Sequence, residues 1–314
     1  MSRLAVLYSC DENYARIMAV SIVSLYENNK EIDDVVVYCL IHNVKDNTKH
    51  NLERISKKYN RSIFFIDSAS ICNNYRFWES NEDSRYVRLL ADRILKEERV
   101  LYLDCDLIIN GNLGELVNLD ISKYAVAAVL DTCRKKARDE SDMQDINKYF
   151  NSGVLLMNLK YWRDYNLYEN FKEFKQAHNS KGMFRDQRVL NGTLEGKAYI
   201  LKPQYNVTPE LFKFSSSQII RLCKIGSFYS QGEIKEARKK PIVVHFAGVS
   251  IYRPWFENCE HKYTKQYREY MKKDQFTHFE LKRENSMGSR ISMFVKYYMP
   301  ASLFIMTYSL FRKD

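Results

Sequence analysis

The sequence predicts an α/β fold: a Rossmann-like mixed sheet flanked by helices, followed by a small basic and aromatic helical tail. Short apolar runs alternate with segments of helical spacing through the first half of the chain. Strands that are apolar on both faces are typical of sheets covered by helices on each side. The chain has 314 residues, 45% of them hydrophobic, and is long enough to enclose such a core.

Each expected element follows from one of these runs. Apolar runs predict strands at residues 4–10, 34–41, 62–66, 99–103, 124–130, 152–159 and 242–244. Helical spacing predicts helices at residues 13–29, 46–59, 84–97 and 257–273. The charged segment 134–147 is expected to be a loop or a surface helix. The alternation favours parallel strands, and such sheets bind ligands beyond the carboxyl ends of their strands.

Polar side chains gather at these strand ends. They are Ser9, Asp11 and Asn13 after the first strand, Asp104, Cys105 and Asp106 after the fourth, Asp131 after the fifth, and His245 after the last. Asn151 comes just before the strand at 152–159. We therefore expect a functional site at one rim of the sheet.

The Asp104-Cys105-Asp106 string is a candidate metal site. Residues i and i+2 of an extended chain face the same side, so both carboxylates can meet one hard cation such as Mg²⁺ or Mn²⁺. Imidazole suits Mn²⁺ when carboxylates complete the site, which makes His245 a candidate ligand. A single Asp-x-Asp is common by chance, and a capping or loop role is the alternative.

A phosphate contact is suggested just beyond His245. Gly248 would let the backbone approach a phosphate closely, and Arg253 offers a fork of donors for its oxygens. The net charge of +10 and the pI of about 9.1 favour an anionic partner. Nucleic acid, a nucleotide diphosphate and an anionic lipid surface all fit that charge.

The cysteines and the termini bear on location. Seven cysteines are widely spaced without a Cys-x-x-Cys pair, which favours reduced core thiols in a reducing, cytoplasmic compartment. The first apolar run is too short for a signal peptide, and we predict that it is a strand.

Residues 281–314 hold six basic and two acidic side chains around an apolar, aromatic middle. They predict a tail that lies on an anionic membrane, and packing against the domain is the alternative.

Several strings, taken in order, resemble the family 8 glycosyltransferases. They are Ser9-Cys10-Asp11-Glu12-Asn13-Tyr14, Tyr86-Val87-Arg88-Leu89, Leu101-Tyr102-Leu103-Asp104-Cys105-Asp106, Phe150-Asn151-Ser152-Gly153, Asp186-Gln187, and His245-Phe246-Ala247-Gly248 with Pro254-Trp255. The resemblance covers roughly residues 4–255. It implies a GT-A catalytic domain over residues 1–256, followed by a helical region over residues 257–314.

The resemblance also implies a role for each site residue. Asp104, Asp106 and His245 look like Mn²⁺ ligands, and Mg²⁺ is the alternative ion. Ser9, Asp11 and Asn13 resemble a uridine site. Arg88, Cys105, Gly248 and Arg253 resemble further contacts to the donor or its diphosphate. Asp131, Asn151, Asp186 and Gln187 look like the groups that hold the donor hexose and line the reaction centre.

The implied activity is transfer of galactose or glucose from a UDP-sugar with retention of configuration. Retention usually calls for a carboxylate nucleophile, but the matching position holds an amide, Gln187. We therefore favour same-face attack by the acceptor, with Asp186 as the alternative nucleophile. The family commonly has Lys where this chain has Arg253, and Arg is not a neutral replacement in a phosphate contact.

The expected acceptor is a glycan, glycolipid or glycoprotein, such as bacterial surface polysaccharide or lipopolysaccharide, at the inner face of the cell membrane. Three other functions are alternatives. A nucleotidyltransferase would want a glycine-rich phosphate loop, which residues 9–13 lack. A non-catalytic sugar-nucleotide-binding or membrane-scaffold protein of the same fold would differ from the glycosyltransferase only in lacking turnover. A nucleic-acid binder is disfavoured because no recognised binding motif is present.

Overall fold

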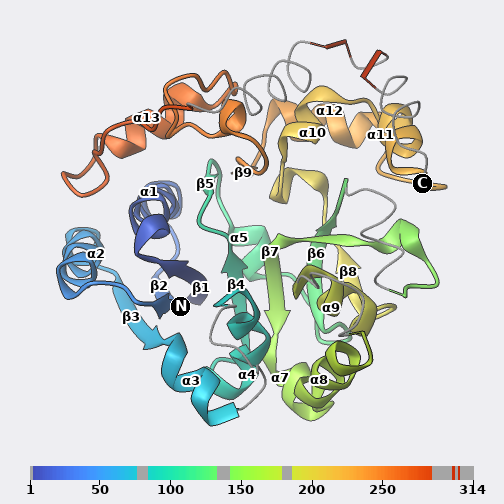
Figure 1. Cartoon of the computed structure of the whole chain (residues 1–314), viewed down its shortest axis with the longest axis horizontal. Coiled ribbons are helices and arrows are strands. Elements are labelled where there is room, and N and C mark those ends of the chain that lie inside the picture. Colours follow the sequence, from blue (N-terminus) through green and yellow to red (C-terminus); the bar gives the residue numbers. More distant parts are fainter. Residues whose placement is uncertain are drawn as a thin grey trace.

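The computed structural model describes residues 3–75, 84–132, 142–178, 186–284, 299–300 and 303–304. Its centre is a seven-stranded mixed sheet of order β3-β2-β1-β4-β7-β6-β8, flanked by helices (Figure 1). The strands are β1 (Arg3–Asp11), β2 (Asp34–His42), β3 (Ser62–Asp67), β4 (Arg99–Leu103), β6 (Val126–Leu130), β7 (Phe150–Asn158) and β8 (Ala198–Ile200). The predicted fold class is confirmed.

Strand direction changes in the middle of the sheet. β1, β2, β3 and β4 are parallel, as the alternation predicts, whereas β7 runs antiparallel to β4 and to β6. The start of β7 therefore lies at the same rim as the end of β4, and the Asp104 amide donates to the Gly153 carbonyl over 2.8 Å. The antiparallel strand thus carries its own polar residues to the rim where the parallel strands end.

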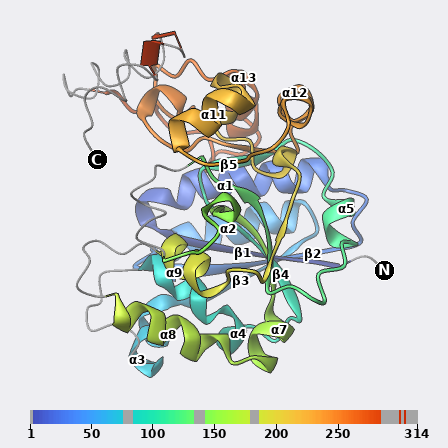
Figure 2. The ribbon, with the colours of Figure 1, turned by 90° about the vertical axis from the view of Figure 1, so that its right-hand side faces the viewer.

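Helices cover both faces of this sheet (Figure 2). Leu4, Val6 and Tyr8 of β1 share one core with α1 (Glu12–Asn28), α2 (Asp46–Lys58) and α13 (Thr264–Met271). Ala5 and Leu7 point to the other face. There they pack with η1 (Ser84–Leu90), α4 (Ala91–Ile94), α7 (Leu159–Asp164), α8 (Leu167–Ala177) and α9 (Asp186–Thr193). Alternate residues of one strand supply two cores, which explains its unbroken apolar run.

The predicted strand at 242–244 is present and belongs to a second, small sheet. The predicted strand at 242–244 is β9 (Val243–His245), and it pairs antiparallel with β5 (Leu107–Ile109) instead of joining the main sheet. β9 is also tied to the preceding chain, because the Val207 amide donates to the Val243 carbonyl over 2.9 Å. A three-residue apolar run carries no information about which sheet it enters.

Two predicted helices are shorter than expected. Residues 84–97 form the 3₁₀ helix η1 and then the single turn α4, because almost every described side chain from 86 to 92 is buried and packing overrides regular winding. Within 257–273 only α13 is helical. Its approach is an irregular loop in which the Glu260 amide donates to the Ile251 carbonyl over 3.0 Å.

The remaining helical elements are α3 (Ser68–Tyr75), α5 (Gly114–Val117), η2 (Ile146–Lys148), η3 (Pro203–Tyr205), α10 (Pro209–Lys213), α11 (Ser216–Cys223), α12 (Gln231–Lys239) and η4 (Ser250–Tyr252). Of these, α10, α11 and α12 lie together in the upper part of Figure 1, on the same side of the main sheet as β9. Of the predicted charged segment 134–147, residues 134–141 lie outside the described residues.

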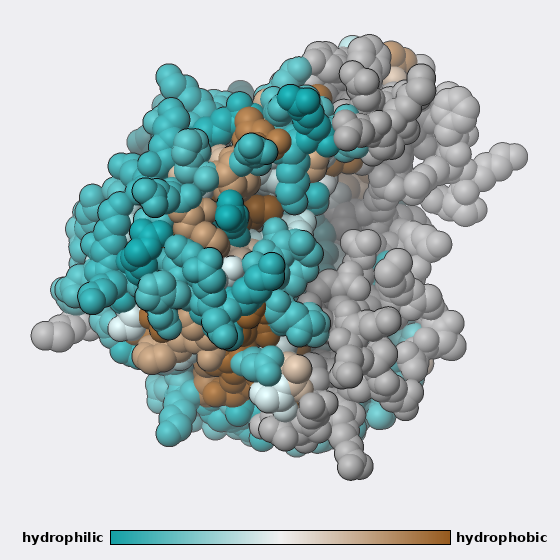
Figure 3. All heavy atoms as spheres, turned by 60° about the vertical axis from the view of Figure 1, so that its left-hand side comes forward, coloured by the Kyte–Doolittle hydropathy of each residue, from teal (hydrophilic) through white to brown (hydrophobic). Residues whose placement is uncertain are grey.

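Most of the predicted tail also lies outside the described residues. Within its described part, Phe304 packs 5.8 Å from the Phe214 ring, centroid to centroid. No helix among the described residues is long and apolar enough to cross a membrane. Hydrophilic side chains cover much of the described face in Figure 3, with apolar patches between them.

The described cysteines are free thiols. Cys10, Cys39, Cys105 and Cys223 are buried, and Cys259 is partly buried. The side chains of the other two cysteines lie outside the described part of the chain. Small buried thiols of this kind act as core residues, as the sequence predicts.

Candidate active site

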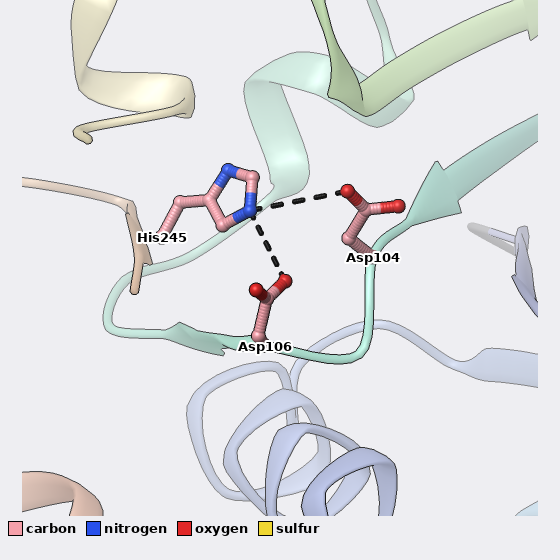
Figure 4. A group of neighbouring side chains, drawn as sticks. All are labelled: Asp104, Asp106 and His245. Atoms are coloured by element: carbon pink, nitrogen blue, oxygen red, sulfur yellow. Dashed lines mark hydrogen bonds and ion pairs between the residues drawn. The ribbon is translucent and has the colours of Figure 1, made fainter. Parts of the chain in front are cut away.

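Two aspartates and a histidine converge beyond the end of β4 (Figure 4). Asp104 follows β4, Asp106 precedes β5, and His245 is the last residue of β9. Leu107 pairs with His245 across the small sheet, and the Phe246 amide donates to the Asp106 carbonyl over 2.8 Å. The two-stranded sheet therefore places the histidine against the Asp-x-Asp turn.

These three side chains have the chemistry and spacing of a divalent cation site. His245 Nε2 lies 3.1 Å from Asp106 Oδ1 and 3.9 Å from Asp104 Oδ2. One potential ligand atom from each residue lies within 4.8 Å of the others. Two carboxylates and one imidazole suit Mn²⁺, and the residues that the sequence singles out as metal ligands lie together.

Neighbouring residues hold the His245 ring in an orientation that suits a metal ligand. Its Nδ1 lies 3.0 Å from Asn206 Oδ1, an acceptor that holds the proton on Nδ1 and leaves Nε2 facing the carboxylates. Gly153 packs against the ring so closely that an added Cβ would lie 2.4 Å from His245 Cε1 and 3.0 Å from Asp104 Oδ2. No side chain larger than hydrogen fits there while the triad keeps this arrangement.

The electrostatics of the triad favour a cation. Burial alone would lower the pKa of His245, but the carboxylates of Asp106 and Asp104 raise it overall. Burial raises the pKa of Asp104. Burial alone would also raise the pKa of Asp106, but His245 and Arg253 hold it below its usual value. The cluster thus attracts protons that a metal ion would displace, so a bound metal would be released in acid.

Arg88 connects the triad to a second group of side chains. Its guanidinium forms a buried ion pair with Asp186, the first residue of α9. It also donates to the Ser152 carbonyl over 2.9 Å, to Ser152 Oγ over 3.1 Å and to Asp104 Oδ1 over 3.3 Å. The guanidinium also lies over the Tyr102 ring, whose centre is 4.3 Å from the guanidinium carbon. A lysine offers a single point of charge and cannot reproduce this fork.

The second group is a closed hydrogen-bond network around Gln187. The amide Oε1 accepts from the Ser152 amide over 2.9 Å and from Ser152 Oγ over 3.0 Å. The amide Nε2 donates to Asp131 Oδ2 over 2.7 Å, and Asn151 Nδ2 donates to Asp131 Oδ1 over 3.2 Å. Burial raises the pKa of Asp131 despite these hydrogen bonds. Asp131, Asn151, Asp186 and Gln187, which the sequence assigns to the reaction centre, lie in one group.

Asn206 joins the two groups. It donates from Nδ2 to Asn151 Oδ1 over 2.7 Å while its Oδ1 faces His245 Nδ1. No pattern in the sequence predicts a role for Asn206, Ser152 or Gly153. Asn206 lies at the end of η3 and is fully buried, and no spacing rule marks such a residue. The Asn151-Ser152-Gly153 string was noted, but nothing in it shows that the glycine makes room for a histidine 92 positions later.

The predicted uridine residues lie at the end of β1. Asp11 caps α1 and accepts from the Tyr14 amide over 3.0 Å, and Asn13 Nδ2 donates to Asp11 Oδ2 over 3.3 Å. Cys105 is buried and donates to the Ser9 carbonyl over 3.2 Å, so its thiol ties β1 to the Asp-x-Asp turn. The carboxylate of Asp11 therefore has a structural role as a helix cap, and its contact with a nucleoside stays a prediction.

The phosphate candidates lie on the loop after His245. Gly248 has a φ of +100°, in the region that favours glycine. Arg253 Nε is buried and has no hydrogen-bond partner among the described residues. An enclosed guanidinium donor without an acceptor is costly, and a phosphate oxygen would supply one.

A mixed sheet with an Asp-x-Asp turn and a histidine at its rim has the features of the GT-A class of glycosyltransferases, and comparisons with known proteins place the chain in that class. The profile described as "Glycosyl transferase family 8" matches residues 5–259. The chain belongs to glycosyltransferase family 8, a family of retaining enzymes that use UDP-sugars.

Individual relatives and solved structures have low sequence identity to this chain. General stress protein A of Bacillus subtilis is 29% identical over 84% of this chain and 92% of its own. A lipopolysaccharide 1,2-glucosyltransferase of Escherichia coli K12 is 26% identical over 84% of this chain and 76% of its own. The galactosyltransferase LgtC has the same fold, with a TM-score of 0.68 and 20% identity over 85% of this chain and 95% of its own. The bifunctional glycosyltransferase WbbM matches with a TM-score of 0.73 and 19% identity over 88% of this chain, which spans 51% of that larger chain.

Proposed function

We propose that this enzyme transfers galactose or glucose from a UDP-sugar to a glycan, glycolipid or glycoprotein acceptor, with Mn²⁺ as the preferred cation and Mg²⁺ as the alternative. The observation that carries the proposal is the triad of Asp104, Asp106 and His245, with potential ligand atoms within 4.8 Å of one another. A cation held there would stabilise the negative charge that develops on a departing diphosphate.

The residues around the triad would hold the rest of the donor. Arg253 supplies an unsatisfied buried donor for a diphosphate oxygen, and Gly248 lets the backbone approach it. Ser9, Asp11 and Asn13 at the end of β1 would contact the nucleoside. Arg88 holds Asp186 and Ser152 in place through an ion pair and a hydrogen bond. The hexose would therefore bind to donors and acceptors that are already oriented.

The hydrogen bonds of the second group favour same-face attack by the acceptor. Gln187 is held through both ends of its amide, and Asp186 is tied to Arg88 in a buried ion pair, which makes its carboxylate a weak nucleophile. In the proposed step the bond from the anomeric carbon to the UDP oxygen breaks and a bond to the acceptor oxygen forms on the same face. The acceptor proton passes to an oxygen of the departing diphosphate.

The proposed setting is the cytoplasmic face of a bacterial membrane. The names of two relatives, both lipopolysaccharide 1,2-glucosyltransferases of Escherichia coli, support a surface polysaccharide or lipopolysaccharide acceptor. We propose that residues 1–256 are catalytic and that residues 281–314 bring the enzyme to its acceptor on anionic lipid. Removing residues 281–314 should abolish sedimentation with phosphatidylglycerol vesicles. Unchanged sedimentation would show that the tail has no part in membrane binding.

The donor and the stereochemistry can be tested together. The purified enzyme is incubated with UDP-galactose or UDP-glucose and Mn²⁺, and proton NMR follows the anomer that is released before mutarotation. We expect one of the two sugars to be hydrolysed faster and the α-anomer to appear first. Initial release of the β-anomer would contradict retention. Binding of UDP without turnover, with every acceptor offered, would favour the non-catalytic alternative.

A further inference from the structure

A cavity of about 380 Å³ lies beside the site described above and has no role in the proposed donor contacts. It opens between α10, η4 and the loop at residues 260–262, and Pro209, Phe212 and Tyr252 form part of its wall. A volume of this size accommodates a small molecule such as a monosaccharide.

The chain links this cavity directly to the candidate active site. Pro209 comes shortly after Asn206, which positions His245, and Tyr252 comes directly before Arg253. The His261 ring, another part of the wall, packs edge-on with its centre 4.9 Å from that of Phe246, the neighbour of His245. The loop that carries Gly248 and Arg253 therefore borders the cavity through Tyr252.

The wall combines aromatic rings with positive charge. Phe212 and Tyr252 offer flat apolar surfaces, and Lys213, Lys262 and Glu260 supply two ammonium groups and one carboxylate. Burial lowers the pKa of Lys213, although Glu210 partly opposes this shift, so an anion near its ammonium group would offset a cost of desolvation. An excess of positive charge around a small cavity favours an anionic ligand.

His261 is a buried polar residue of this wall. Its Nδ1 accepts from the Tyr263 amide over 3.2 Å, which leaves the proton of the neutral ring on Nε2. The side chain is only 6% exposed, and Nε2 has no hydrogen-bond partner among the described residues. Burial and the adjacent Lys262 lower the pKa of His261 to about 4, so the ring stays neutral near pH 7.

We propose that this cavity is an acceptor subsite for a saccharide that carries a negatively charged group, either a phosphate ester or a carboxylate. Lys213 and Lys262 would pair with the anion, Phe212 and Tyr252 would pack against the sugar ring, and Glu260 would accept from its hydroxyl groups. The proposal rests on the glycosyltransferase function proposed above and names the class of acceptor that the same enzyme takes.

The test uses the full-length enzyme saturated with UDP and Mn²⁺, so that added anions cannot occupy the donor site. Four probes are titrated by NMR: a hexose, the matching hexose 6-phosphate, the matching hexuronate, and inorganic phosphate. Each titration is repeated with Lys213→Met, Lys262→Met and Lys265→Met. Lys265 is an exposed lysine of α13 that does not line the cavity, so its variant is the matched control.

We expect the hexose phosphate or the hexuronate to bind at least about tenfold more tightly than both the hexose and inorganic phosphate. Lys213→Met and Lys262→Met should each weaken that binding about tenfold, and Lys265→Met should leave it unchanged. Equal binding of the neutral hexose, equal binding of inorganic phosphate, no binding of any probe, or wild-type binding by both cavity variants would each overturn the proposal. Binding of UDP with Mn²⁺, measured first in every variant, separates these outcomes from a failure of the proposed function.

Discussion

His245 Nε2 lies 3.1 Å from Asp106 Oδ1, although 139 residues separate the two along the chain. The pair exists because β5 begins directly after Asp106 and pairs with β9, whose last residue is His245. Asn206 fixes the other side of the imidazole ring. The small sheet therefore assembles the candidate metal site at the rim of the larger one.

Replacing Asp106 by Asn should remove metal-dependent activity while the protein stays folded. The amide keeps the shape of the side chain but loses the negative charge that a hard cation needs. We expect turnover of the UDP-sugar to fall at least about 100-fold, since even the loss of an outer contact to a metal ligand costs about 10- to 100-fold. Circular dichroism checks the fold, and near wild-type turnover would refute the metal assignment.

Gly153→Ala should disturb the same site by steric conflict. The new methyl group would lie 2.4 Å from His245 Cε1, so either the ring or β7 must move. We expect a loss of about 1–3 kcal/mol in the free energy of unfolding, together with weaker Mn²⁺ binding. Gly232→Ala is the control, because its methyl group would meet nothing closer than Ser230 Oγ at 3.8 Å. Equal behaviour of the two variants would show that the close packing at Gly153 is unimportant.

Asn206→Ala should weaken metal binding without removing a metal ligand. His245 would lose the acceptor for its Nδ1 proton and with it a fixed ring orientation. We expect the concentration of Mn²⁺ needed for half-maximal activity to rise about 10- to 100-fold. Saturating Mn²⁺ should then restore much of the rate. A rate that stays low at every Mn²⁺ concentration would mean that Asn206 acts on the reaction centre instead, through Asn151.

Arg88→Lys should preserve the positive charge and still impair the enzyme. Lysine cannot reach Asp186, Ser152 and Asp104 together, because it lacks the planar fork of donors. We expect kcat to fall about 100-fold, as for the loss of one preorganised donor in other active sites, with a smaller change in UDP affinity. Steady-state kinetics combined with UDP titration separates the two effects. Weaker UDP binding with kcat unchanged would place Arg88 in binding alone and contradict the prediction.

The stability of the enzyme should depend on His261 in weak acid. The pKa of this histidine is about 4 in the folded protein and about 6.5 when exposed, so the unfolded chain binds more protons between these values. Above pH 6.5 His261 therefore does not lower the free energy of unfolding. As the pH falls towards 4, protonation of the unfolded chain lowers that free energy by about 3 kcal/mol in all. Urea denaturation at a series of pH values should show a shallower decline for His261→Gln. Parallel curves for the two proteins would contradict the assignment.

The sequence predicted the parts of the site that follow strands. Asp104 and Asp106 were found because an apolar run ends just before them, and His245 because it ends another run. Their common location follows from the rule that sites lie at strand ends, even though β7 and β9 break the parallel pattern. Local patterning therefore identified the candidate metal ligands without identifying the sheet that joins them.

Other features depend on contacts between distant segments and leave no local pattern. Asn206 is set by its two partners, one in β7 and one in β9. The 3₁₀ winding around Arg88 arises from burial on nearly every side, where sequence spacing alone predicts an α-helix. The cavity beside Tyr252 is formed by three segments, and only the folded chain brings them together.

Release of UDP from UDP-galactose and UDP-glucose, with Mn²⁺ and then with EDTA, is the most direct test of the proposed chemistry. We predict slow hydrolysis of one sugar nucleotide in the absence of acceptor, its loss in EDTA, and its return when Mn²⁺ is added back. Hydrolysis that EDTA leaves unchanged, or a failure of UDP to bind in the presence of Mn²⁺, would contradict a metal-assisted transfer at Asp104, Asp106 and His245.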